Sequence, residues 1–203
     1  MTQIKASMQY QTRALLALGF ILLTGSIAYS QRAATQDEID RAQLVLGRVL
    51  NSESDAEHHL LFLQSYIEQS PWQFRTVVDI SQKLLSAHES LGDVQRAIVA
   101  CGDAAVAASV EDDDLVFERI TFALFAVKSD RTVVSALSEL ESAGIPVYEL
   151  LSAMTGLSAA KTRALGESGR VNPKGTFQVL LDAFERKYHG LAAKRAEQLK
   201  KKR

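Results

Sequence analysis

The chain has 203 residues, a single cysteine and a formal net charge of −1. A chain of this length buries one hydrophobic core and forms one domain or two. Cys101 has no second cysteine to pair with, which excludes an intramolecular disulfide, so we expect it to be a small buried side chain on a helix.

The charge changes sign along the chain. Residues 1–36 hold three Lys or Arg and no acid, and residues 37–185 hold 23 acids against 12 Lys and Arg. Residues 186–203 hold eight Lys or Arg against one acid, Glu197. Such a basic tail can contact nucleic acid, an anionic lipid surface or an acidic partner. We favour the simpler interpretation of a solvated helix end, where lysines also suit the helix dipole.

The first predicted element is an apolar segment at residues 14–30, which carries no charge and follows Lys5 and Arg13. A basic start, a short apolar run and the small-residue exit Ala28-Tyr29-Ser30 are typical of a secretory signal. The run is short for a transmembrane helix, which needs about 20 apolar residues. The segment is therefore a cleaved signal, a weak membrane anchor or an apolar helix packed against protein, and taken alone it favours the signal.

Helix caps punctuate the rest of the chain, and strand patterns are almost absent, so the sequence predicts an all-α fold. Capping boxes begin helices at Thr35, Ser54 and Ser70, and the first of these helices runs to about Asn51. Pro71 stands at the first position of the third helix, where its missing N–H costs nothing.

The middle of the chain reads as shorter helices. Gly92-Asp93 predicts a short helix over residues 93–101, and Gly102-Asp103 predicts a short alanine-rich turn to about Ala108. The acids of Glu111–Asp114 begin a longer helix, because acids in a first turn complement the helix dipole. Their aspartates lack the glycine-containing loop and the downstream glutamate of a calcium site, so we do not expect a metal there.

The last third of the chain is the richest in helix boundaries. Thr132 caps a helix that ends at Gly144, and Pro146 begins a helix that ends at Gly156. Ser158 begins the next helix, which Gly166 and Gly169 end. Asn172-Pro173 begins a long helix that frays into the lysine tail. The expected fold is a compact array of short helices with a hydrophobic N-terminal helix and a long basic C-terminal helix.

No pattern for catalysis or metal binding is present. His58 and His59 project about 100° apart on a helix and do not share a face. A Walker loop, a His-Glu-x-x-His pair, a Cys-x-x-Cys pair and a Gly-x-Ser-x-Gly turn are all missing from the sequence. The alanine-rich surroundings of Cys101 do not favour a thiolate nucleophile. We therefore expect no enzyme, no catalytic residue, no cofactor and no metal site.

A series of short motifs follows this helix punctuation. In chain order the motifs are Phe20–Tyr29, Asp37-Glu38 with Leu46-Gly47, Ser70-Pro71-Trp72-Gln73-Phe74, Ser81-Gln82-Lys83-Leu84, Gly102-Asp103-Ala104-Ala105, Arg119-Ile120-Thr121-Phe122-Ala123 and Leu140–Phe177. Their order and spacing resemble the N-terminal region of tail tape measure proteins of long-tailed phages and prophages. The structural motif positions are Pro71, Phe74, Gln82, Leu84, Gly102, Asp103, Gly144, Ile145, Pro146, Leu150, Leu151, Gly156, Ser158, Gly169 and Phe177.

The resemblance covers most of residues 14–195 and departs from the family at Leu124-Phe125 and Ser129-Asp130, where the family has a Gly-Gln step and a Lys-Gly turn. Tape measure proteins continue for hundreds of residues beyond this region, so the resemblance implies an N-terminal domain alone, as a split gene, a prophage remnant or a recruited module. Within that family the apolar segment is not exported, which favours a packed or membrane-active helix over a cleaved signal.

The resemblance implies a non-enzymatic structural or assembly protein in three parts: residues 1–34, a helical domain at 35–185 and a basic end at 186–203. Expected partners are a second copy, other tail or assembly proteins, and a membrane through residues 14–30. The expected location is the phage tail or the host cytoplasm.

Two alternatives remain at this point. One is an exported or membrane-anchored helical binding module, which would lie in the periplasm or at the membrane. The other is a helix-turn-helix DNA-binding protein, with Gly156 at the turn and Lys161 and Arg163 facing phosphates. The acidic balance of residues 37–185 opposes DNA contact except through the basic tail.

Overall fold

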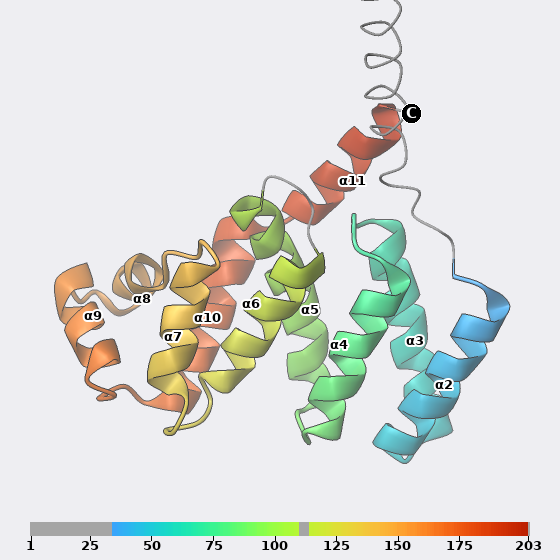
Figure 1. Cartoon of the computed structure of the whole chain (residues 1–203), viewed down its shortest axis with the longest axis horizontal. Helices are drawn as coiled ribbons and strands as arrows, with labels where there is room; N and C mark the ends of the chain where they lie inside the picture. Colours follow the sequence, from blue (N-terminus) through green and yellow to red (C-terminus); the bar gives the residue numbers. More distant parts are fainter. Residues whose placement is uncertain (1–33, 110–113, 203) are drawn as a thin grey trace, which may run out of the picture. The chain divides into compact units, whose positions relative to one another are not determined.

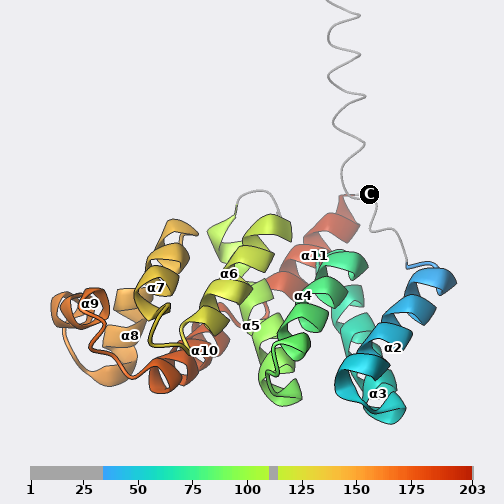
Figure 2. The ribbon, with the colours of Figure 1, turned by 60° about the horizontal axis from the view of Figure 1, so that its bottom comes forward.

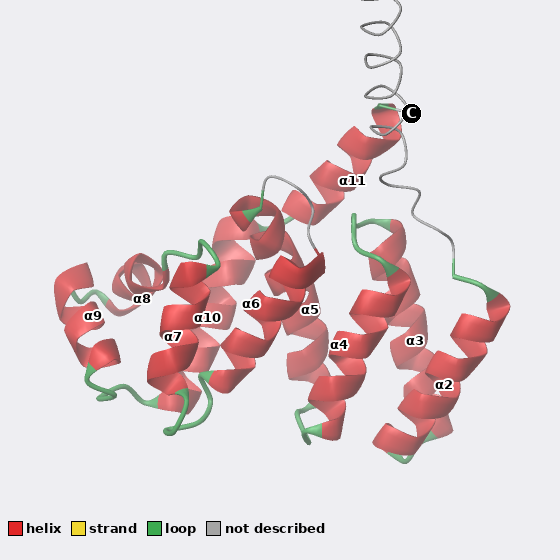
Figure 3. Ribbon diagram, viewed as in Figure 1, coloured by secondary structure: helices red, strands yellow, loops and turns green. Residues whose placement is uncertain are grey.

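Helical hairpins stacked side by side make up the part of the chain that the computed structural model describes, residues 34–109 and 114–202 (Figure 1). The helices are α2 (Gln36–Leu50), α3 (Glu53–Glu68), α4 (Phe74–Ser86), α5 (Leu91–Ala108), α6 (Asp114–Ala126), α7 (Val133–Ser142), α8 (Val147–Thr155), α9 (Ala159–Glu167), α10 (Pro173–Tyr188) and α11 (Leu191–Lys201). Figure 3 shows helices joined by loops, with no strand among these residues, so the all-α expectation is confirmed.

The order of packing follows the order of the chain from α2 to α7. The α2–α3 hairpin packs on α4, and α4, α5, α6 and α7 then pack one against the next. Helix α10 returns to lie along α5 and also contacts α6 and α8, while α9 packs on α8 and α7 (Figure 2). One apolar core runs through this array from α2 to α10, and its largest fully buried side chains include Trp72, Phe117, Phe177 and Phe184.

Several of the expected helix boundaries are confirmed. Thr35 forms a complete capping box with Glu38, and α2 ends at Asn51 in the left-handed conformation. Gly156 ends α8 with a φ of 73°, and the Ser158 hydroxyl accepts a hydrogen bond from the Lys161 N–H at the start of α9. Each of these boundaries depends on chemistry within a few residues, which is why local sequence predicts it.

Two of the expected capping boxes are wrong. Helix α3 is capped by Ser52, not Ser54, because Asn51 turns the chain sharply enough for the next helix to begin two residues earlier. Ser70 and Pro71 are buried in a turn, and α4 begins only at Phe74. Trp72, which follows Pro71, is fully buried and stacks on Phe117 with ring centroids 4.9 Å apart. Burial of this large side chain outweighs a capping preference that is worth about 1 kcal/mol.

The expected break at Gly102-Asp103 is also wrong. Helix α5 is continuous from Leu91 to Ala108, and its cap is Ser90, whose hydroxyl accepts a hydrogen bond from the Asp93 N–H. A glycine inside a helix costs about 1 kcal/mol relative to alanine but does not end the helix. Gly102 instead allows other side chains to pack closely against α5.

The long C-terminal helix expected from Asn172-Pro173 is two helices. Asn172 does cap α10 by accepting a hydrogen bond from the Gly175 N–H, with Pro173 at the first position. Helix α10 ends at Tyr188, and α11 begins after Gly190, whose φ of 74° turns the chain. The expected hydrophobic N-terminal helix at residues 14–30 lies outside the described residues. Among the helices that are described, none has both the length and the apolar character needed to cross a bilayer.

Candidate functional site

Gly102 of α5 lies against Tyr66 of α3 and Trp72 of the loop between α3 and α4. A Cβ atom added to Gly102 would lie 1.9 Å from the Tyr66 hydroxyl oxygen of α3 and 2.7 Å from Trp72 Nε1. Both distances are far inside van der Waals contact. The motif glycine is therefore required because a tyrosine and a tryptophan close over the backbone of α5. Burial raises the pKa of the Tyr66 hydroxyl well above its ordinary value, and the nearby Asp103 carboxylate adds to this.

Asp103 connects α5 to the C-terminal helix. Its carboxylate oxygens accept hydrogen bonds from the N–H groups of Gly190 and Ala192, each at 2.8 Å, and its side chain is almost fully buried. These donors are the exposed N–H groups at the start of α11, and a carboxylate at a helix N-terminus also complements the helix dipole. A residue from the middle of the chain thus caps a helix 89 positions later.

We expect Asp103→Asn to loosen α11 without unfolding the array. The amide keeps one acceptor and loses the charge, so the local opening free energy of α11 should fall by about 2 kcal/mol, a roughly thirtyfold rise in opening. Hydrogen exchange of the α11 amides measures this directly. The matched control is Asp79→Asn, which removes the same charge from an exposed site on α4. Unchanged exchange in α11 would show that Asp103 does not hold it.

The block from Gly144 to Gly169 is built from turns. Gly144 has a φ of 90°, and a Cβ atom there would lie 3.5 Å from Ala108 Cβ. Ile145 is buried, and Pro146 precedes the first residue of α8. Gly169 has a φ of 67° after α9. These residues set the turns between the consecutive helices α7, α8, α9 and α10.

The other motif residues divide between the core and the surface of the array. Leu84, Leu150, Leu151 and Phe177 are buried in the core. Pro71 is buried in the turn before α4. Phe74 and Gln82, in contrast, line a surface hollow of about 350 Å³ between α2 and α4. The fifteen motif positions therefore do not converge on one cavity: some set helix ends or close contacts, and others fill the core or line the surface.

A buried polar network at His59 had no signal in the sequence. His59 is fully buried on α3, where its Nε2 lies 2.6 Å from the Ser81 hydroxyl of α4 and its Nδ1 lies 3.1 Å from Gln95 Nε2 of α5. Burial lowers the pKa of His59 from 6.5 to about 4. The neutral imidazole therefore joins three helices through hydrogen bonds. Its neighbour His58 is exposed, which confirms that the two rings do not share a face.

Lys128 forms a second contact that sequence reasoning missed. Its ammonium lies 2.5 Å from Glu89 and 3.1 Å from Asp93, and 4.0 Å from the ring centroid of Phe177. Burial opposes ionisation of Asp93, but the hydrogen bond and the charge of Lys128 hold the pKa of this carboxyl below its ordinary value. In the sequence, Lys128 is a single lysine after an apolar helix. This pattern does not indicate its acidic partners, which lie 35 and 39 positions earlier.

Cys101 is buried on α5, as expected, and burial raises its pKa to about 12. The thiol is therefore protonated at neutral pH and is a poor nucleophile. Within residues 34–109 and 114–202, no group of three or more His, Cys, Asp or Glu side chains is arranged to hold a metal ion. Most of the acidic segment Glu111–Asp114 lies outside the described residues, so its expected capping role stays a prediction.

The helix-turn-helix alternative depends on Lys161 and Arg163 of α9. The Arg163 guanidinium donates two hydrogen bonds to Glu141 of α7, at 2.8 and 2.9 Å, and lies 4.3 Å from the ring centroid of Tyr148. This bidentate pair neutralises the charge that a phosphate contact would need. The geometry of α8 and α9 therefore adds no support to DNA binding.

No protein-family model, curated protein or solved structure matches this chain.

Proposed function

We propose that the chain is a non-enzymatic structural or assembly protein of the phage tail tape measure type, corresponding to the N-terminal region of that family. The order of the motifs in the sequence motivates the proposal. The observation that supports it best is the position of the motif residues in the fold. Gly102, Gly144 and Gly156 all stand at close contacts or left-handed turns, where the backbone requires glycine.

The chemistry of the described surface is consistent with this role. Several ion pairs join neighbouring helices: Lys83 pairs with Glu118 across α4 and α6, and Arg96 pairs with Asp182 and Glu185 across α5 and α10. Such pairs fix how helices pack and provide no reactive group. A protein of this kind acts through the surfaces that it presents to partners.

The test is the composition of tail particles. Particles released from cells that produce the chain would be separated by sedimentation, digested and analysed by mass spectrometry. We expect peptides from residues 34–202 in the fraction that contains tail-tube proteins. Cells that lack the gene provide the control fraction. Recovery of the chain only with free protein, in cells that do release tails, would contradict the proposal.

A further inference from the structure

One end of the helical array has an exposed apolar surface. The α2–α3 hairpin packs on α4, and Lys200 of α11 donates a hydrogen bond to the Glu68 carbonyl oxygen at the end of α3. Leu44 of α2 and Leu61 of α3 are each 57 % exposed. The terminal unit of a stacked helical array normally has a polar outer face, because nothing stacks on it. Two exposed leucines on a terminal hairpin therefore indicate a surface that a partner covers.

Leu44 also lines a hollow that contains two carboxylates. The hollow has a volume of about 680 Å³, and Asp40, Leu44, Arg48 and Glu53 are among the residues that line it. Asp40 and Leu44 are one helical turn apart on α2, and Glu53 begins α3. A leucine between two carboxylates suits a lysine side chain, whose alkyl stem covers the leucine while its ammonium reaches the acids.

The two ends of the described sequence carry opposite charges, and in the fold they meet where Lys200 of α11 reaches the carbonyl oxygen of Glu68. The hairpin, residues 35–68, holds seven acids against Arg41 and Arg48, a net charge of −5. Six of those acids form no ion pair with any residue in the described ranges: Asp37, Asp40, Glu53, Asp55, Glu57 and Glu68. Since these charges are not balanced within the hairpin, its outer side attracts a cationic partner.

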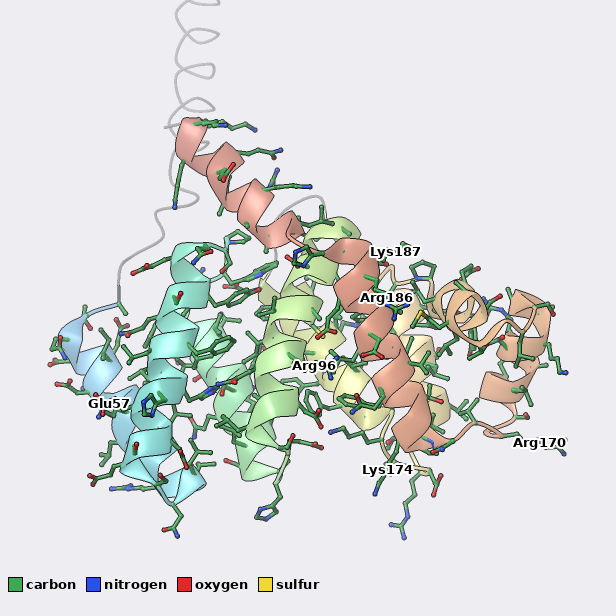
Figure 4. All side chains as sticks on the ribbon, turned by 180° about the vertical axis from the view of Figure 1, so that it is seen from behind. Glu57, Arg96, Arg170, Lys174, Arg186 and Lys187 are labelled. Carbon is green, nitrogen blue, oxygen red and sulfur yellow. The ribbon has the colours of Figure 1, made fainter. Side chains whose placement is uncertain are left out.

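The complementary surface lies on α11 and the end of α10. Six exposed basic side chains there form no ion pair within the described part of the chain: Arg186, Lys187, Lys194, Lys200, Lys201 and Lys202. Figure 4 shows Arg186 and Lys187 on α10, close to the start of α11, and Glu57 on α3. Lys194 and Lys201 are seven positions apart and share one face of α11.

We propose that the outer side of α2–α3 binds the lysine-bearing face of α11 from a second copy of this chain. A symmetric dimer through two α2–α3 surfaces would place net charges of −5 against each other. The head-to-tail contact instead places an acidic surface against a basic one, so like charges do not face each other. Because the two surfaces differ, the contact repeats, and copies join into a ring or an open chain. This inference does not rest on the proposed function.

Sedimentation velocity of the full chain tests the contact. We expect species larger than a monomer at about 50 mM salt, and an apparent dissociation constant at least about tenfold higher at about 500 mM salt, because exposed charges are screened. A monomer at low salt would contradict the proposal. Assemblies that persist unchanged at high salt would also contradict it.

Charge reversal separates head-to-tail from symmetric association. Asp40→Lys with Glu53→Lys should give a monomer, and so should Lys194→Glu with Lys201→Glu. When these two variants are mixed, the intact α11 face of the first fits the intact hairpin of the second. The two reversed surfaces are also opposite in charge, so assembly should be restored. The control reverses two exposed charges elsewhere, Arg131→Glu with Glu149→Lys, and should assemble as the parent does. Mixed variants that remain monomeric, or a Lys194/Lys201 variant that still assembles, would overturn the proposal.

Discussion

Replacing Gly102 by alanine should destabilise the fold by about 3 kcal/mol or more, which is at the upper end of the usual cost of overpacking a core. The new methyl group would lie 1.9 Å from the Tyr66 hydroxyl oxygen and 2.7 Å from Trp72 Nε1. Tyr66 sits between helices and Trp72 is fully buried, so neither ring can move without disturbing its neighbours. Urea unfolding followed by circular dichroism measures the loss.

The matched control lies in the same helix. Gly92 has no atom within 4 Å of an added Cβ, so Gly92→Ala should be neutral or stabilising by up to about 1 kcal/mol. A double variant tests the cause of the strain: Tyr66→Phe removes the oxygen that the new methyl group meets and should recover part of the loss. Equal stability of Gly102→Ala and Gly92→Ala would disprove the close contact at α5.

Acid should weaken the fold through His59. Its pKa is about 4 in the folded state against 6.5 when exposed, so the unfolded chain binds a proton more readily. The stability contributed by the neutral imidazole is complete above pH 6.5 and is lost as the pH falls toward 4, with a loss of about 3 kcal/mol at pH 4. Unfolding free energies measured between pH 7 and pH 4 would show this slope.

The variant His59→Gln removes the titration and leaves an amide to meet Ser81 and Gln95. This variant should be less stable than the parent at neutral pH, and its stability should fall less between pH 7 and pH 4. The control His58→Gln removes a histidine from the exposed side of the same helix and should keep the pH dependence of the parent. If His59→Gln loses as much stability in acid as the parent does, carboxylates and not the buried ring explain the slope.

Most of the successful predictions depend on interactions between residues that are close in the sequence. The all-α class, the capping box at Thr35, the turn at Gly156 and the start of α10 at Asn172-Pro173 all depend on residues within one helical turn. The expected burial of Cys101 is also confirmed, because an unpaired cysteine behaves as a small hydrophobic side chain. The errors at Ser54 and Ser70 came from competing caps and from burial of Trp72, which a cap pattern does not register.

Contacts between segments that are distant in the sequence could not be predicted from it. The sequence predicted a helix end at Gly102, because a glycine next to an aspartate is a common turn signal. The structure shows that the glycine is needed for close packing against Tyr66, 36 positions away, and Trp72. Gly102-Asp103 predicted a local alanine-rich turn, whereas Asp103 caps the distant helix α11. The network at His59 needs three helices to be placed together before any of its hydrogen bonds can be inferred.

The most direct test of the account is whether tails assemble without this chain. Cells whose gene is deleted would be induced to release particles, and the particles would be counted and measured by electron microscopy. We expect few or no intact tails, restoration by the parent chain and by Gly92→Ala, and no restoration by Gly102→Leu. Tails of normal number and length in the deletion strain would contradict a role in tail assembly.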